Sequence, residues 1–487
     1  MPTDGNILTR RQCLQTGIAT LGGLALHGQA PAAKKPNILF IAVDDLRPEL
    51  ACYGRDYIKS PNIDRIARQG MTFNRAYCQQ AVCSPSRSSL LTGTRPDTTK
   101  VWDLVTHFRD ALPNVISLPQ NFKQNGYFVQ GMGKIYHPGF DDERCWSVPW
   151  QTPQAPTYAK LKTADVPDED KPKSKGGPAF ESADVPDNFF KDGMVADLAV
   201  KTLRDISKKS EPFFFAVGFA KPHLPFVSPK KYWDLYDPAK IKLAPNPYHP
   251  KGAPDYALTN SNEVRNYTGI PAEGPFPDDL ARQLKHGYYA AVSYTDAQVG
   301  KVLDELDRLD LRKNTIIVLW GDHGWKLGEH GEWAKHSNVE NDTNAPLLLS
   351  VPGMKNAGAH TDALVEFVDI YPTLSELAGI PLPGHLEGTS FKPLLDNPKR
   401  PWKPAAFSQY PRGQARMGYS MRTDRYRFTV WVGRQDHSRI DAIELYDHVA
   451  DPQENTNVAS LPANADLVKQ LMEQWRKGWK AAKPPVR

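Results

Sequence analysis

Short, continuous apolar runs alternate along the chain with longer segments whose apolar residues have helical spacing. The apolar runs that end abruptly at polar residues lie at residues 37–43, 127–132, 212–219, 315–320 and 345–351. Such runs are typical of strands that are buried on both faces of a parallel sheet. Helical spacing is found at residues 60–68, 116–125, 193–207 and 280–309. The pattern predicts an α/β fold with a large, mostly parallel sheet flanked by helices.

Three further segments have a different pattern of apolar and polar residues. Residues 71–77 alternate like a strand, and residues 146–192 are rich in proline, lysine and aspartate, which predicts a long surface excursion. After residue 383 the chain carries short β-type runs between 405 and 447 and a helical pattern at 463–481. We therefore expect a catalytic domain over residues 31–383 and a smaller α+β domain, with an antiparallel sheet and a final helix, over residues 384–487.

Residues 1–30 have the features of an export signal. They contain the pair Arg10-Arg11, a mild apolar run at 17–26 and small residues at 28–30. The run is too short to span a bilayer. The twin arginine predicts an exported protein, periplasmic or extracellular, without a stable membrane span; an unstructured tail is the alternative.

Composition excludes some classes of protein. Of the 487 residues, 40% are hydrophobic and 24% charged, as in a globular protein. The net charge of +5 is too small and too dispersed to indicate a nucleic-acid partner. The five cysteines, Cys13, Cys52, Cys78, Cys83 and Cys145, do not form a disulfide framework, although one pair among Cys52, Cys78 and Cys145 stays open.

Polar residues follow several of the apolar runs directly. Asp44 and Asp45 follow the first run, and Asp322 and His323 follow the run at 315–320. Ligands of α/β proteins bind at the carboxyl ends of strands. Two adjacent carboxylates are easily ionised together only beside a cation, so Asp44 and Asp45 are candidates for a metal site. A solvated turn is the simpler alternative for Asp44 and Asp45.

The most informative stretch surrounds Cys83. Cys83-Ser84-Pro85-Ser86-Arg87 is followed by Leu91-Thr92-Gly93, and the serine- and leucine-rich run at 88–91 predicts a helix with Arg87 about one turn from the cysteine. This spacing resembles the C-x-P-S-R…L-T-G pattern of type I sulfatases. In that family a dedicated formylglycine-generating enzyme oxidises the cysteine to formylglycine, which hydrates to a gem-diol.

The chemistry of sulfate esters explains why such a group is needed. Hydrolysis requires a nucleophile, cations around the sulfuryl oxygens and an acid for the leaving group. A thiolate would leave a stable thiosulfate ester. A gem-diol avoids this, because one hydroxyl attacks sulfur and the other then expels sulfate by reforming the aldehyde.

The resemblance assigns roles to further residues and implies an alkaline phosphatase-like fold. Lys134 and His137 would line the formylglycine, and His223 would protonate the leaving oxygen or hold sulfate; without the resemblance each would pass for a solvated loop residue. Lys335 matches the family lysine that contacts the sulfate. The metal site would comprise Asp44, Asp45, the modified Cys83, Asp322 and His323. Many relatives have asparagine in place of His323, but the carboxylate oxygens favour one Ca²⁺ ion.

Within this family the chain most resembles the iduronate-2-sulfatases. The residues that carry this resemblance lie at 44–48, 79–83, 95–99, 221–223, 322–325 and 418–423. It implies removal of a 2-O-sulfate from a uronic acid of a sulfated glycan, with Lys335, Arg95 and Trp325 contacting the sugar. The alternatives are another sulfated polysaccharide, a phosphoester or phosphonate hydrolase of the same fold, and a non-catalytic glycan-binding protein.

Overall fold

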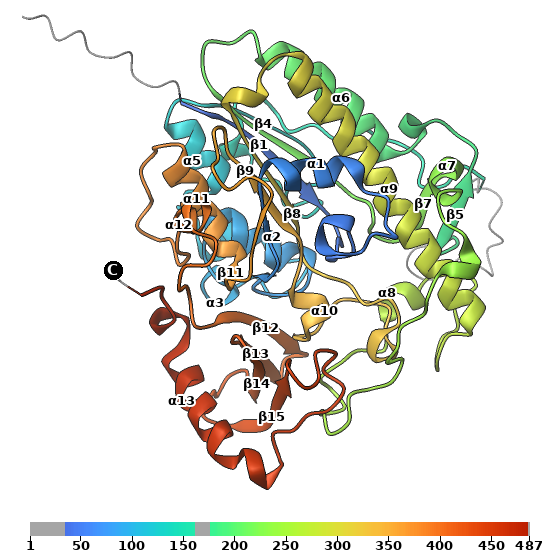
Figure 1. The fold of residues 1–487 in the computed structure, drawn as a ribbon, viewed down its shortest axis with the longest axis vertical. Helices are drawn as coiled ribbons and strands as arrows, with labels where there is room; N and C mark the ends of the chain where they lie inside the picture. The colour runs from blue at the N-terminus through green and yellow to red at the C-terminus, as the bar shows by residue number, and fades with distance from the viewer. Residues whose placement is uncertain (1–34, 161–175, 486–487) are drawn as a thin grey trace, which may run out of the picture. The chain divides into compact units, whose positions relative to one another are not determined.

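A seven-stranded mixed sheet forms the centre of the protein (Figure 1). The structure is a computed structural model that describes residues 35–160 and 176–485. The predicted leader therefore lies outside the described residues. The strand order is β10 (Ala359–Thr361), β2 (Met71–Phe73), β9 (Leu347–Ser350), β8 (Thr315–Gly321), β1 (Asn37–Val43), β6 (Phe213–Phe219) and β4 (Phe128–Gly133).

The four strands β8, β1, β6 and β4 are parallel to one another, whereas β9 runs antiparallel to both β8 and β2. Every residue of β1, β6 and β8 is buried. Their continuous apolar runs are explained by this burial on both faces, because each face packs against helices. The predicted mixed, mostly parallel sheet is confirmed.

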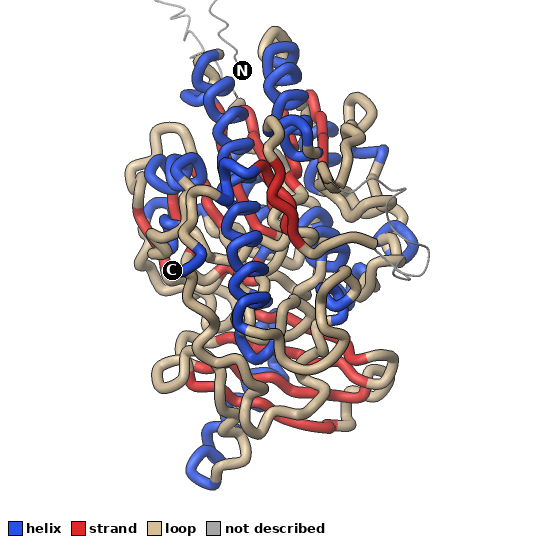
Figure 2. Tube along the Cα trace, turned by 90° about the vertical axis from the view of Figure 1, so that its right-hand side faces the viewer, coloured by secondary structure: helices blue, strands red, loops and turns tan. Residues whose placement is uncertain are grey.

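Helices cover both faces of the sheet (Figures 1 and 2). Alternate residues of β1 point to opposite sides: Leu39 and Ile41 join one hydrophobic cluster, and Ile38 and Phe40 join another. The first cluster includes residues of α1 (Pro61–Gln69), α6 (Lys191–Ile206) and the long α9 (Asp278–Arg308). The second includes residues of α2 (Cys83–Thr92), α5 (Leu118–Gln124) and α11 (Ile370–Leu377).

The predicted strand at 71–77 is two short strands in two different sheets. Residues Met71–Phe73 form β2, and Ala76–Tyr77 form β3, which pairs with β11 (Val365–Glu366). Between them the side chains of Asn74 and Arg75 both bind Asp362. The successive polar residues Asn74 and Arg75 interrupt the alternation at this break, a signal that the prediction of one strand overlooked.

A four-stranded antiparallel sheet follows the large sheet in sequence. It contains β12 (Ala406–Arg412), β13 (Arg416–Arg422), β14 (Tyr426–Gly433) and β15 (Ile440–Asp447) in chain order, and α13 (Ala465–Ala481) ends the chain's regular structure. Met421, Phe428 and Leu445 of this sheet share a core with Leu471 of α13. These elements match the predicted α+β segment. Pro36–Arg487 form one compact unit, so a domain boundary at residue 383 stays a prediction.

The predicted surface excursion contains one strand, β5 (Phe180–Ala183), which pairs with β7 (Phe226–Pro229). Residues 161–175 of the excursion lie outside the described residues. The remaining helices are short: α3 (Pro96–Thr99), α4 (Phe108–Ala111), α7 (Lys230–Trp233), α8 (Asn262–Arg265), α10 (Glu340–Thr343) and α12 (Lys392–Asp396). No helix in the two described ranges has the length and apolar character needed to cross a membrane.

Candidate active site

The carboxyl ends of β1 and β8 bring two pairs of polar residues together. Val43 and Gly321 are partners in the parallel ladder, so the residues that follow them are neighbours. The backbone N–H of Asp322 donates to the carbonyl of Val43 at 3.2 Å, and that of Asp45 donates to Asp322 Oδ1 at 3.0 Å. The side chains of Asp44, Asp45 and Asp322 are completely buried.

Cys83 is the first residue of α2, and the helix therefore begins earlier than the predicted run at 88–91. Pro85 is compatible with this start because the first turn of a helix needs no N–H donor there. The preceding residue, Val82, provides no side-chain cap. The free N–H groups and the helix dipole favour an anion at this end of α2. Cys83 Sγ lies 3.4 Å from Asp44 Oδ1 and 3.4 Å from His323 Nε2.

Arg87, one turn into α2, connects the two carboxylate pairs. Its Nε donates to Asp322 Oδ2 at 2.9 Å and its Nη2 to Asp44 Oδ1 at 3.2 Å. Its Nη1 donates to the carbonyls of Lys134 and Ile135, at 2.6 and 3.0 Å. The side chain is completely buried. The guanidinium thus fixes three segments of chain relative to one another through its planar fork of donors.

Lys134 follows a sharp turn at the end of β4. Gly133 has a φ of 68°, and a Cβ at this position would lie only 2.0 Å from the carbonyl oxygen of Gly218, so only glycine fits. The turn directs the Lys134 ammonium to Asp44, with which it forms an ion pair, and to within 3.7 Å of Cys83 Sγ.

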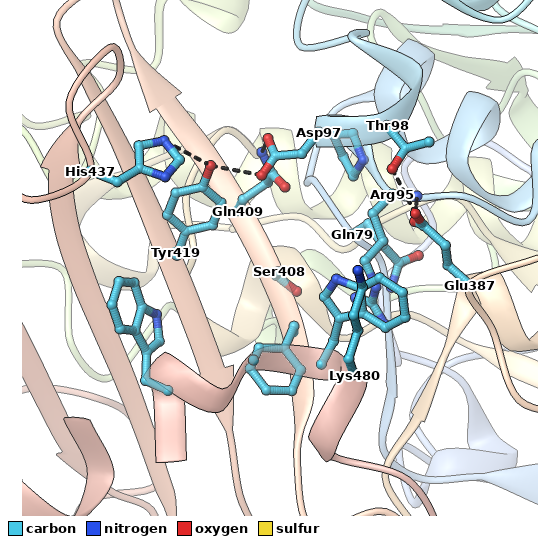
Figure 3. A pocket seen from close by; sticks show the side chains of 15 residues that line it. Gln79, Arg95, Asp97, Thr98, Glu387, Ser408, Gln409, Tyr419, His437 and Lys480 are labelled. Atoms are coloured by element: carbon cyan, nitrogen blue, oxygen red, sulfur yellow. Dashed lines mark hydrogen bonds between the residues drawn. The ribbon is translucent and has the colours of Figure 1, made fainter. Parts of the chain in front are cut away.

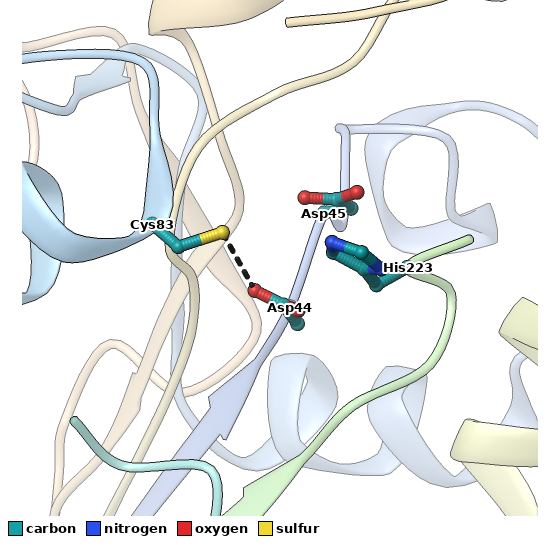
Figure 4. A group of neighbouring side chains, drawn as sticks. All are labelled: Asp44, Asp45, Cys83 and His223. Atoms are coloured by element: carbon teal, nitrogen blue, oxygen red, sulfur yellow. Dashed lines mark hydrogen bonds between the residues drawn. The ribbon is translucent and has the colours of Figure 1, made fainter. Parts of the chain in front are cut away.

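Lys335 and His223 complete the cluster from the other side. Lys335 Nζ donates to both carboxylate oxygens of Asp45, at 2.9 and 3.0 Å, and lies 4.8 Å from the ring centroid of Trp325. The imidazole of His223 lies beside Asp45 in Figure 4. Glu263 of α8 joins Lys335 and His223: its carboxylate is 3.0 Å from Lys335 Nζ and 3.0 Å from His223 Nε2.

The acidic and basic side chains of this cluster nearly balance in charge, but a further cation would still be favourable. Burial disfavours the ionised form of Asp44, yet Lys134 and the other cations outweigh it and hold the pKa of Asp44 well below its usual range. Burial instead raises the pKa of Asp322, against the opposing effect of Arg87. A divalent cation would allow both carboxylates to ionise.

The donor atoms also fit a metal ion. One ligand atom from each of Asp44, Cys83, Asp322 and His323 lies within 4.8 Å of the others. His323 Nδ1 faces the carbonyl oxygen of Gly324 at 2.9 Å, and since a carbonyl can only accept, Nδ1 carries a hydrogen and Nε2 is the ring nitrogen directed at the cluster.

A cavity of about 270 Å³ opens beside the cluster. Asp44, Lys134, His137, Lys221 and His223 are among its lining residues. Burial, and then the charge of Lys134, lower the pKa of His137 to about 4, so its imidazole is neutral near pH 7. The cavity therefore combines several cations with a neutral base, which suits an anionic substrate that must exchange protons.

Comparison with known proteins identifies the family of the chain. A family model described as Sulfatase matches residues 36–380. The chain belongs to the sulfatase family. It is therefore an enzyme that hydrolyses sulfuric esters. A second family model, described as N-sulphoglucosamine sulphohydrolase, C-terminal, matches residues 328–480 of this sulfatase.

Individual relatives agree with this assignment. Iduronate 2-sulfatase of Mus musculus is 38% identical, with 89% of this chain and 93% of the relative covered. The human iduronate 2-sulfatase is 37% identical, with 90% and 93% covered. Among solved structures, the phosphonate monoester hydrolase of Agrobacterium radiobacter has a TM-score of 0.73 at 21% identity, over 92% of this chain and 96% of that chain. This last likeness concerns the fold, which is the alkaline phosphatase-like fold expected from the sequence.

Two residues expected to contact the sugar are held by other parts of the protein. Arg95 donates to both carboxylate oxygens of Glu366, at 2.8 and 2.9 Å, and lies over the ring of Trp479 in a different pocket (Figure 3). Trp325 is completely buried beneath Lys335 and packs against Phe226. The structure thus brings ten of the expected residues into or beside the cluster, Asp44, Asp45, Cys83, Arg87, Lys134, His137, His223, Asp322, His323 and Lys335, but not Arg95.

Sequence reasoning missed Glu263. It lies in a segment without periodicity, in a four-residue helix, and no motif surrounds it. Its distance in sequence from both partners leaves no local signal that could have found it. The pKa of Glu263 is nevertheless held well below its usual value, because the charges of Lys335 and His223 outweigh its burial.

Proposed function

We propose that this sulfatase removes a 2-O-sulfate from a uronic acid residue of a sulfated glycan, with a formylglycine at position 83 as the source of the nucleophile. The observation that carries the proposal is the position of Cys83: it begins α2, lies 3.4 Å from Asp44, and has Lys134 at 3.7 Å. The identity of 37–38% to two iduronate 2-sulfatases supports the choice of substrate.

The environment of the unmodified thiol supports the modification. Burial, and then the charge of Asp44, raise the pKa of Cys83 well above its usual value. The thiol would therefore stay protonated, and a protonated thiol is a poor nucleophile. Formylglycine at this position would supply two hydroxyl groups as its hydrate, one to attack sulfur and one to release sulfate. Its formation requires a formylglycine-generating enzyme or an equivalent partner.

The surrounding side chains have complementary roles in this proposal. Lys134, which lines the cavity, and Lys335, which is buried beside Asp45, hold the sulfuryl oxygens. His137, neutral near pH 7, accepts a proton from the nucleophile. We assign to His223 the donation of a proton to the leaving sugar oxygen, because its imidazole lines the cavity, with Nδ1 2.6 Å from the Leu224 carbonyl and Nε2 3.0 Å from Glu263.

We assign the cation site to Asp44, Asp45, Asp322 and His323, together with the residue at position 83. Three carboxylates form a hard donor set, which favours calcium over transition metals in spite of the single imidazole. The ion would supply positive charge to polarise the sulfate. Arg87 orients two of these carboxylates and so keeps the site in place. Export through a twin-arginine leader is part of the same proposal.

Phosphonate hydrolysis is the second candidate, because a phosphonate monoester hydrolase shares the fold. The test compares turnover of a 2-O-sulfated uronic acid disaccharide, its 6-O-sulfated isomer, an aryl sulfate and an aryl phosphonate monoester. The proposal expects the 2-O-sulfated disaccharide to have the highest kcat/KM. A preference for the phosphonate would overturn the reaction, and a preference for the 6-O-sulfate would overturn the substrate.

A further inference from the structure

A groove of about 560 Å³ lies outside the active site and is lined by lysine and tyrosine side chains. Its walls come from the loop before α1, the segment after α7 and the first half of α9. Among the lining residues are Lys59, Lys240, Lys242 and Lys285, but only one carboxylate, that of Asp237. The groove therefore has an excess of positive charge.

Few of these lysines are neutralised by the protein. Lys240 lies 3.6 Å from Asp237, and since its side chain is 85% exposed this ion pair is weak. Lys59 and Lys242 are exposed and form no ion pair with the residues that the structure describes. Three of the four ammonium groups thus lack a carboxylate partner within the described parts of the chain.

Of the four lysines, Lys285 gives the strongest indication of a bound anion, because it is buried. It is 7% exposed, and its Nζ donates to the backbone carbonyl of Lys242 at 2.8 Å. No described carboxylate forms an ion pair with it, although an ammonium has three donors and a buried charge normally has a partner. Burial lowers the pKa of Lys285, only partly opposed by more distant carboxylates such as Glu49. An anion in the groove would provide the missing partner.

The tyrosines give the groove a second, apolar character. The hydroxyls of Tyr57 and Tyr289 donate to the same oxygen of Glu49, at 2.9 and 2.8 Å. Glu49 is itself paired with Arg47 at 2.9 Å, and Arg47 also pairs with Glu329. The two ring centroids are thereby held 5.7 Å apart, with Tyr57 45% exposed and Tyr289 only 4% exposed. Fixed aromatic rings suit the C–H faces of sugar rings.

We propose that this groove is a second binding site for the substrate chain, in which the lysines bind sulfate or carboxylate groups and the tyrosines contact sugar rings. The inference rests on the proposed glycan substrate. A nucleic acid or an anionic membrane would require a longer track of cations than these four lysines provide. A short segment of an anionic glycan matches both the number of charges and the aromatic surface.

The loop that follows β1 connects the groove with the active site. Asp45 lies at the metal-ligand cluster, and Glu49, four residues later, supports the groove. Four residues span at most about 14 Å. Tyr288 of α9 anchors this loop, since its hydroxyl donates to the Asp45 carbonyl at 2.8 Å and accepts from the Arg47 N–H at 3.0 Å. The loop therefore keeps the residues that support the two sites within about 14 Å of each other.

The test measures direct binding by protein that retains Cys83 as a cysteine, so that no turnover occurs. The variants are the double substitution Lys59→Gln/Lys242→Gln and the single substitution Lys285→Met. The matched control, Lys208→Gln/Lys313→Gln, removes the same charge from lysines that are 74% and 73% exposed and lie outside the groove. The ligands are a 2-O-sulfated oligosaccharide, its desulfated form, the 2-O-sulfated monosaccharide, an oligonucleotide of equal charge and anionic vesicles.

We expect each groove variant to raise the Kd for the sulfated oligosaccharide on the order of tenfold, with the monosaccharide and the control unaffected. Equal weakening in the control, or equal binding of the desulfated chain, would overturn the proposal. Tighter binding of the oligonucleotide or vesicles would overturn the choice of ligand. In enzyme whose Cys83 has been converted to formylglycine, the groove variants should raise KM for the oligosaccharide and leave kcat unchanged. If the protein binds the oligosaccharide in this way but hydrolyses no sulfate ester once Cys83 is converted to formylglycine, the proposed function is refuted, whereas the inference about the groove is retained.

Discussion

Replacement of Arg87 by lysine separates the charge of this residue from its geometry. Arg87 makes four hydrogen bonds at once, two to carboxylates and two to carbonyls, in a completely buried position. Lysine keeps the positive charge but has a single nitrogen, which cannot reach Asp44, Asp322 and the carbonyl of Ile135 together. At least two buried acceptors would then lose their donor.

The expected loss follows from these contacts. A buried acceptor left without its donor costs about 1–3 kcal/mol, and partial loss of a buried ion pair adds to this. We therefore expect Arg87→Lys to lower the free energy of unfolding by about 3–5 kcal/mol. Asp44 would also lose its alignment with Cys83, and kcat/KM should fall on the order of 100-fold.

Urea unfolding followed by tryptophan fluorescence measures the first effect, and hydrolysis of an aryl sulfate measures the second. The matched control is Arg204→Lys, because Arg204 also donates to both oxygens of a carboxylate, that of Glu305, but with a side chain that is 52% exposed. This control should change the unfolding free energy by less than about 1 kcal/mol. If Arg87→Lys behaves like the control in both assays, the argument that the site depends on the geometry of the buried guanidinium is refuted.

Three further predictions test other parts of the site. Replacement of His223 by alanine should slow a sugar sulfate on the order of 100-fold, but an aryl sulfate with an acidic phenol much less; equal losses would remove its role as the acid. Asp45→Asn should weaken calcium binding on the order of 100-fold in titration calorimetry, and an unchanged affinity would exclude Asp45 as a ligand. Burial opposes ionisation of Glu366, but Arg95 and Lys403 outweigh it and bring its pKa to about 2, from an ordinary value of 4.5. Its stabilisation, about 3 kcal/mol, should thus be complete above pH 4.5 and be lost as the pH falls towards 2, whereas Glu366→Gln should remove this part of the acid sensitivity in pH-dependent melting.

The sequence predicted the centre of this fold well because burial there has a simple signature. Strands β1, β6 and β8 are covered on both faces, and apart from Asn37 and Thr315 at their starts their positions are apolar or glycine. The polar residues that follow them were equally visible, because parallel strands end at the same edge of the sheet. The apolar runs thus predicted that Asp44 and Asp322 follow strands, and the resemblance to the sulfatases joined them in one site.

Other features depend on contacts that leave no local pattern. Arg95 follows a motif that resembles the family, yet Glu366, 271 residues away, binds its guanidinium. Glu263 completes the contacts of Lys335 and His223 from a four-residue helix with no periodicity. In each case the partner is chosen by tertiary packing, and the spacing of residues along the chain contains no information about it.

The most direct test of this account is the mass of the tryptic peptide 76–87 from protein made in its own host. This peptide contains both Cys78 and Cys83, so fragment ions must locate any change. The account predicts a loss of about 18 Da at Cys83, the difference between a thiol and an aldehyde, with Cys78 unchanged. An unmodified Cys83 in protein that hydrolyses sulfate esters would contradict it, because the reaction would then proceed without formylglycine.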